Sequence, residues 1–204
     1  MDSSWTTSRR GFAEAAGWFV ATTALVDGRW ADPGLGEWDV RSLVGHTSRA
    51  LLTVESYLQR PAEQVDLASA VAYYRATSAI AAGPGVAERG RDAGEALGTD
   101  PARAVATIRD RVLPVVDGCD GTELVTTIAG GMRLSDYLPT RTFELVAHTA
   151  DLAAALGLES EPPALAAEQV LELVGRLAVA GGRATQLLRA ATGREGLPPG
   201  FTVL

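Results

Sequence analysis

The chain has 204 residues, enough for one domain that buries a substantial core without a disulfide or a structural metal. Hydrophobic residues make up 47% and charged residues 21%, which is typical of a globular protein and excludes a disordered one. The net charge of −7 and the lack of a basic run argue against nucleic acid and anionic membranes as partners, and no apolar stretch approaches the roughly 20 residues that span a bilayer.

The first part of the chain predicts two helices joined by a loop. Residues 4–27 carry apolar side chains at helical spacing. Asp39 stands where an N-cap belongs, at the start of a second helix that runs to about residue 59. Trp30 and Trp38 bracket the loop between these helices, and we expect them to pin it to the bundle.

The middle of the chain predicts two further helices and a weaker stretch. One helix is expected over residues 63–82, ended by the Gly83-Pro84-Gly85 break. Residues 86–97 are charged and contain glycine, so they are predicted to be weakly helical at best. Asp100 followed by Pro101 is a strong start signal for a helix that reaches about residue 116.

The last part of the chain changes character twice. Residues 122–134 predict a short β-hairpin around a glycine turn, after which Ser135 is placed to cap a helix. Pro139 is expected within about the first turn of that helix, where proline is tolerated best. A proline-rich break precedes a final helical region, residues 164–191, which Gly181-Gly182 can split in two.

These elements predict a mainly all-α protein. The expected architecture is an antiparallel four-helix bundle with a short β-hairpin before the last bundle helix and a small C-terminal helical extension. We expect the bundle over residues 1–160 and the extension, packed on it, over residues 161–204.

The stretch from Arg141 to Asp151 places several chemically capable side chains on one helical face. Glu144 and His148 are an i, i+4 pair, and Asp151 lies one turn further along. A carboxylate and an imidazole one turn apart can hold one metal ion, and the same pair also forms simple ion pairs. The other histidine of the chain, His46, lies at the edge of the apolar stripe of the second predicted helix. The sequence therefore leaves two interpretations open, a metal site shared by two helices and two structural histidines.

Two other features are placed outside this site. Cys119 is the only cysteine, so no intrachain disulfide forms, and its flanking aspartates disfavour the thiolate. Arg9-Arg10 resembles part of a twin-arginine export motif, but Glu14 interrupts the apolar segment that should follow. We therefore expect a cytoplasmic protein.

Three segments together resemble one known family. They are WDVRSLVGH, which ends at His46; LSDYL followed by RTFELVAHTAD, which ends at Asp151; and the closing TGR with LPP. They are similar to the mycothiol-dependent maleylpyruvate isomerase family, within the DinB-like superfamily of metal-binding four-helix bundles. The resemblance covers most of the chain in the order that the family has it.

The resemblance implies a metal triad and its surroundings. His46, Glu144 and His148 match the family's metal ligands, and Asp151 matches the acid that follows them. The implied metal is Zn²⁺, with Fe²⁺ or Ni²⁺ as alternatives, and the implied thiol is mycothiol.

Two further sets of residues complete the expected site. Asp151 and Arg141 are expected in catalytic positions, while Thr47 and Arg49 are expected, with Arg141, to bind mycothiol at the rim. The fuller isomerases supply a substrate-binding arginine from a larger C-terminal domain. Here only Arg176, Arg183, Arg189 or Arg194 can replace it, and the sequence selects none of them.

The sequence therefore predicts a mycothiol-dependent metalloenzyme. A metal-activated thiolate would isomerise a small electrophilic substrate or be transferred to it. The alternatives are a thiol-independent hydrolase or lyase/cyclase of a biosynthetic pathway and a bundle that binds metal or a small ligand without turnover. The expected partners are a small-molecule substrate and a low-molecular-weight thiol, and the protein is expected to be a monomer or a homodimer.

Overall fold

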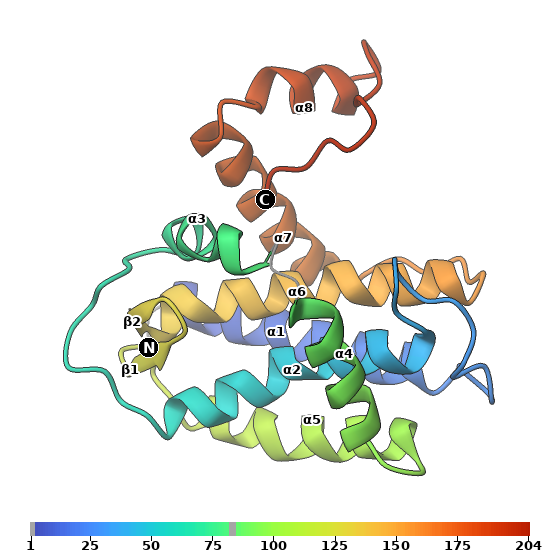
Figure 1. Cartoon of the computed structure of the whole chain (residues 1–204). Coiled ribbons are helices and arrows are strands. Elements are labelled where there is room, and N and C mark those ends of the chain that lie inside the picture. The colour runs from blue at the N-terminus through green and yellow to red at the C-terminus, as the bar shows by residue number, and fades with distance from the viewer. Residues whose placement is uncertain (1–2, 82–84) are drawn as a thin grey trace.

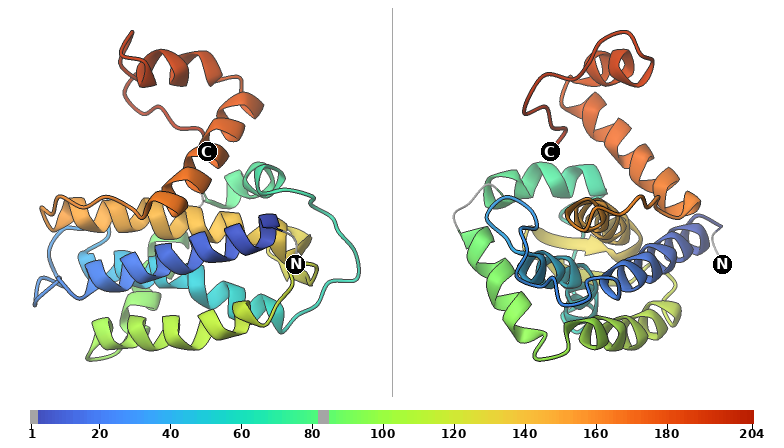
Figure 2. Two further views of the ribbon diagram at one scale, coloured as in Figure 1. Left: turned by 180° about the vertical axis from the view of Figure 1, so that it is seen from behind. Right: turned by 90° about the vertical axis from the view of Figure 1, so that its right-hand side faces the viewer.

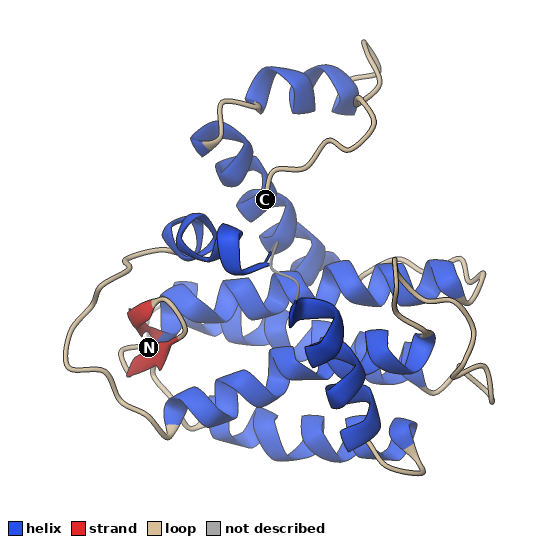
Figure 3. Cartoon of the chain, viewed as in Figure 1, coloured by secondary structure: helices blue, strands red, loops and turns tan. Residues whose placement is uncertain are grey.

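The computed structural model describes residues 3–81 and 85–204 and confirms a mainly all-α fold (Figures 1 and 3). In chain order, the elements are α1 (Ser3–Thr23), α2 (Val40–Leu58), α3 (Ala70–Ala81), α4 (Gly85–Ala96), α5 (Pro101–Asp117), β1 (Leu124–Thr127), β2 (Gly130–Arg133), α6 (Leu134–Ala155), α7 (Ala164–Ala180) and α8 (Ala184–Ala191). None of the helices in these described ranges combines the length and the hydropathy that a bilayer-spanning segment needs.

Helices α1, α2, α5 and α6 form the expected four-helix bundle (Figure 2). Helices α1 and α2 each pack against both α5 and α6, and the interior includes large side chains with no solvent exposure, among them Phe12, Phe19, Leu43, Leu51 and Leu145. The apolar periodicity of these four helices is therefore explained by one shared core. Helix α4 packs on α2, and α3 packs on α6 and α7.

Two predicted helix starts are confirmed by their caps. The Asp39 carboxylate accepts a hydrogen bond from the Ser42 amide at 2.7 Å, which satisfies a free N–H of the first turn of α2. The Asp100 carboxylate does the same for the Arg103 amide at 3.1 Å, with Pro101 at the first position of α5. The first helix is shorter than predicted, because it ends at Thr23 and a turn with Asp27 at φ 42° follows.

The third helix begins at Ala70, later than the predicted residue 63. Residues 61–69 instead run along the β-hairpin, where the amides of Ala62 and Asp66 donate to the carbonyls of Leu124 and Gly131. The Asp66 carboxylate also accepts from the Gly131 amide at 2.7 Å. These contacts with a distant segment were not visible in local propensity, and they replace the first turns of the expected helix. The predicted stop at Gly83-Pro84 lies outside the described residues.

Residues 85–96 form a regular helix, although the sequence predicts weak helicity there. The reason lies in two buried glycines of α4. A Cβ on Gly90 would lie 2.5 Å from the ring of Trp38, and one on Gly94 would lie 2.8 Å from the Arg41 carbonyl oxygen. The glycines that weaken the helix locally therefore allow its close contact with α2, and this packing stabilises it.

The hairpin is confirmed, and it leads directly into α6. Strands β1 and β2 are antiparallel, with Thr127 opposite Gly130. The prediction that Ser135 caps α6 is wrong, because the helix already begins at Leu134. The N-cap residue is Arg133, and its side chain makes no capping hydrogen bond. The first amides of the helix are satisfied by the loop before the hairpin, since Leu134 donates to Glu123 and Ser135 to Gly121. Pro139 lies in the second turn of α6.

The C-terminal region, here called the C-terminal arm, comprises α7, α8 and residues 192–204. Helix α7 buries Ala166, Val170 and Leu173 against the bundle, then rises away from it (Figures 1 and 2). The split at Gly181-Gly182 is as predicted, with Gly182 at φ 69°. No residue of α8 is buried.

Candidate metal centre

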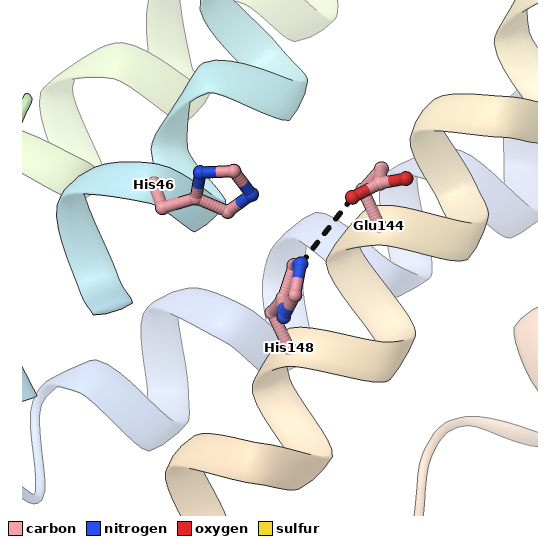
Figure 4. Close-up of side chains that lie close together, drawn as sticks. All are labelled: His46, Glu144 and His148. Carbon is pink, nitrogen blue, oxygen red and sulfur yellow. Dashed lines mark ion pairs between the residues drawn. The ribbon is translucent and has the colours of Figure 1, made fainter. Parts of the chain in front are cut away.

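Helices α2 and α6 bring His46, Glu144 and His148 together. One ligand atom from each residue lies within 4.8 Å of the other two. His46 comes from the middle of α2, while Glu144 and His148 come from successive turns of α6 and face it across the seam between the helices (Figure 4). All three residues are half-buried. The convergence expected from the sequence is therefore present, and metal binding itself remains a proposal.

Glu144 is held by hydrogen bonds at both carboxylate oxygens. The Tyr74 hydroxyl, from α3, lies 2.8 Å from Oε1 and 3.1 Å from the Thr140 carbonyl oxygen, and His148 Nε2 lies 3.3 Å from Oε2. Burial alone would raise the pKa of Glu144, but His148, the Arg141 charge and Tyr74 outweigh it and lower this pKa to about 2. The side chain is therefore a carboxylate throughout the physiological range.

His148 lies between two carboxylates. Its Nδ1 is 3.1 Å from Oδ2 of Asp151, and its Nε2 faces Glu144. Burial would lower the pKa of His148, but hydrogen bonds with Asp151 and Glu144 raise it to about 9. Without a metal the ring is therefore a cation, and Asp151 fixes its orientation. This is the arrangement that commonly orients a metal-binding histidine from behind.

His46 has the opposite electrostatics. Burial, followed by the charge of His148, lowers its pKa to about 4. Its Nδ1 is buried and bonds to no group in the part of the chain that the structure describes, so a second ring proton would have no acceptor there. His46 is therefore a neutral imidazole at neutral pH, the form that binds metals.

Trp38 covers one side of His46. The two rings stack with centroids 4.4 Å apart and an interplanar angle of 32°. The indole is fixed in turn, since its Nε1 donates to the Ala87 carbonyl at 3.0 Å and its ring rests on Gly90. The close packing of α4 on α2 thus holds the wall of the site in place.

The donor set and its spacing fit a divalent ion. Two imidazoles and one carboxylate, with room for an exchangeable ligand, are the ligands of catalytic zinc and also suit non-haem iron. Atoms at about 2.0–2.1 Å from a tetrahedral zinc lie about 3.3–3.4 Å from one another. The distance of 3.3 Å between His148 Nε2 and Glu144 Oε2 matches this ligand-to-ligand distance. A ring nitrogen of His46 lies within 4.8 Å of a ligand atom of each of these residues.

The residues expected at the rim are placed differently. Thr47 is 1% exposed, and its hydroxyl donates to the Leu43 carbonyl at 2.7 Å, so it points into α2 and not to a rim. Arg141 is 9% exposed and lies in the interior as well. Arg49 is half-buried, and its charge acts on His46. The rim interpretation is therefore wrong for Thr47 and Arg141, because both side chains turn inward from their helices.

Sequence reasoning missed two residues of this site, Trp38 and Tyr74. Trp38 was assigned only to pinning a loop, and Tyr74 was not singled out. Both reach the site through tertiary packing, Trp38 from the turn before α2 and Tyr74 from α3. The segment WDVRSLVGH, which begins at Trp38 and carries part of the family resemblance, was a signal for the first, and none existed for the second.

A separate cleft of about 380 Å³ lies elsewhere, between α1, α7 and the N-terminal turns of α6. It is lined by Ser8, Asp136 and Gln169 among others, and none of its lining residues belongs to the metal triad. Arg176 also lines this cleft, and its Nη2 forms an ion pair with Oε1 of Glu172 at 2.5 Å. Arg189 pairs with Glu195 on the arm. The contacts of these two arginines therefore lie away from the triad.

Fold and site together define a four-helix bundle with a candidate centre of two histidines and one carboxylate. The family model of the mycothiol maleylpyruvate isomerase N-terminal domain matches residues 12–153, which include all three candidate ligands. The chain therefore belongs to this family, and the resemblance noted in the sequence is confirmed. The comparisons with curated proteins and with solved structures each gave no match.

Proposed function

We propose that the protein is a mycothiol-dependent metalloenzyme that acts on a small electrophilic substrate. The reaction is isomerisation when the thiol leaves again and S-transfer when it stays attached. The observation that carries the proposal is the convergence of His46, Glu144 and His148 in a chain whose family is named for mycothiol. A divalent ion held by these residues would act as a Lewis acid and lower the pKa of a thiol bound beside them.

The residues around the triad support this role by orienting the three candidate ligands. His46 is neutral at physiological pH, so its lone pair is available without loss of a proton. Asp151 accepts from Nδ1 of His148 and thereby directs Nε2 toward Glu144. Tyr74 holds one oxygen of Glu144 and leaves the other facing the two histidines. Trp38 excludes water from one face of His46.

The proton on His148 makes metal binding depend on pH. The pKa of about 9 for His148 means that the metal-free site carries a proton at neutral pH, which a metal must displace. Coordination of a thiol releases a further proton. Binding of metal and thiol should therefore each strengthen as the pH rises, until hydroxide competes for the same position.

Calorimetric titration of mycothiol into the zinc-loaded protein tests the proposal. We expect binding with proton release, detected by comparing two buffers of different ionisation enthalpy. The S-methyl derivative of mycothiol is the matched control, because it keeps the sugar and lacks the ionisable thiol, and it should bind without proton release and more weakly. Absence of mycothiol binding by the zinc-loaded protein would contradict the thiol-dependent function and favour a thiol-independent metalloenzyme.

A further inference from the structure

Arg141 is a buried cation one helical turn from Glu144. Its guanidinium lies 5.0 Å from the ring centroid of Tyr137 and 5.6 Å from that of Tyr73, between helices α3 and α6. The side chain is nine-tenths buried. Such contacts with aromatic faces stabilise the charge in part, but they give its N–H groups no conventional hydrogen-bond acceptor.

The edge of the guanidinium is almost unused. It offers five N–H donors, of which Nε donates to the Thr140 hydroxyl at 2.9 Å. Within the described residues, neither terminal nitrogen makes a hydrogen bond or an ion pair, and neither is among the polar atoms sealed from solvent without a partner. The two terminal nitrogens therefore have no protein partner in the described residues and keep a small contact with solvent, although the residue as a whole is only 9% exposed.

Among residues 3–81 and 85–204, no carboxylate forms an ion pair with this guanidinium. Glu144 is the acid nearest along the helix, and its two oxygens are already engaged by Tyr74 and His148. The Arg141 charge nevertheless acts on both Glu144 and His46, so the guanidinium shares the electrostatic field of the candidate metal centre. A buried cation with a free bidentate edge beside a ligand site is suited to an anionic ligand group.

We propose that Arg141 binds a carboxylate of the small-molecule ligand of this site. The two oxygens of a carboxylate match the two-nitrogen edge of the guanidinium, which the neighbouring rings of Tyr73 and Tyr137 help to hold in place. This inference deepens the proposed function and rests on it for the identity of the ligand as a substrate. The carboxylate site itself requires only Arg141 and the tyrosines around it. The enzyme would then hold its substrate by an arginine of the bundle and not by one of the C-terminal arm.

The test uses acetate as the probe and acetamide as its uncharged isostere, with binding followed by thermal stabilisation of the full chain. Both probes are measured on zinc-loaded and zinc-free wild-type protein and on Arg141→Met, which keeps an unbranched apolar stem and removes the charge. We expect acetate to stabilise both wild-type forms, acetamide to stabilise neither, and Arg141→Met to weaken acetate binding by about tenfold or more in the zinc-free protein.

The zinc-free measurement separates this inference from the proposed function, since a carboxylate bound to zinc would survive in Arg141→Met and vanish without zinc. Arg141→Lys keeps the positive charge but loses the pair of nitrogens that binds both carboxylate oxygens, so it should retain part of the acetate binding. This variant also provides a test if Arg141→Met does not fold. Equal acetate binding by wild type and both variants, or no stabilisation of zinc-free wild type, would overturn the assignment. Stabilisation by inorganic phosphate equal to that by acetate would overturn the carboxylate preference.

Discussion

The seam between α2 and α6 and the C-terminal arm are built from similar helical sequence but packed in opposite ways. On the side of α2 that α4 covers, which holds the seam in place, glycine allows backbone to approach backbone, so that Gly45 of α2 and Gly94 of α4 touch. The arm exposes large apolar side chains such as Leu171, Val179 and Leu188, and its charges pair at the surface. The family match ends at residue 153, before the arm begins. The comparison indicates that the candidate ligands are held by close packing between helices, whereas α8 of the arm buries no residue.

The largest expected effect comes from adding one methyl group in each region. A Cβ on Gly45 would lie 2.1 Å from the Gly94 nitrogen, so Gly45→Ala must push α4 away and should lower the free energy of unfolding by about 3 kcal/mol. A Cβ on Gly175 of α7 would meet nothing within 4 Å. Gly175→Ala should therefore raise the free energy of unfolding by about 0.5–1 kcal/mol, because alanine has the higher helix propensity. Urea unfolding measures both, and equal effects would remove the contrast between the regions.

The two histidines of the seam predict a stability optimum for the metal-free protein near pH 6.5. The pKa of His148 is raised from 6.5 to about 9, so its contribution is complete below pH 6.5 and is lost as the pH rises toward 9. The pKa of His46 is lowered from 6.5 to about 4, so its contribution is complete above pH 6.5 and is lost as the pH falls toward 4. Each loss amounts to about 3 kcal/mol at most, since one pKa unit corresponds to about 1.4 kcal/mol.

Urea unfolding of the metal-free protein across this pH range measures the optimum. His148→Gln should remove the loss on the alkaline side, and His46→Gln should remove the loss on the acid side. An alkaline loss that persists unchanged in His148→Gln would show that another group causes it. The arm serves as an internal reference, because its ion pairs are exposed and should contribute little pH dependence.

Tyr74 and Tyr73 give a matched pair for the hydrogen bond to Glu144. Tyr74→Phe removes that bond, and loss of such a partner of a metal ligand typically weakens metal affinity 10- to 100-fold. The Tyr73 hydroxyl bonds to no group in residues 3–81 and 85–204, so Tyr73→Phe should leave zinc affinity unchanged. Competition with a chelator measures both affinities, and equal values for the two variants would contradict the role of Tyr74.

Features that depend on interactions within one helix could be predicted from the sequence, and features that depend on contacts between distant segments could not. The caps of α2 and α5 were predictable because Asp39 and Asp100 act within their own first turns. Glu144 and His148 were predictable as a pair because helical geometry alone places them together. His46 joined them only through its scarcity in the sequence and the family resemblance.

The failures involve contacts between distant segments. Helix α4 was underestimated because its glycines weaken it locally and stabilise it only through contact with Trp38 and α2. The missing first turns of α3 result from hydrogen bonds between residues 62–67 and the hairpin. Tyr74 could not be assigned to the site for the same reason, since the packing of α3 on α6 brings it to Glu144.

The smallest expected effect is the removal of residues 183–204. Helix α8 has no buried residue, and the segment packs mainly on α7, so its loss should change the free energy of unfolding by less than about 1 kcal/mol. Zinc content should be unchanged, because all three candidate ligands lie in α2 and α6. Loss of zinc from the shortened chain would assign the arm a part in the centre.

The zinc content of the dialysed protein tests the central claim most directly, with wild type compared with His148→Ala. The core is large enough to fold without a metal, so His148→Ala should keep the circular dichroism spectrum of the wild type. We predict one zinc ion per wild-type chain and none in the variant. Zinc retained in full by folded His148→Ala, or no zinc bound by the wild type, would contradict a metal centre formed by His46, Glu144 and His148.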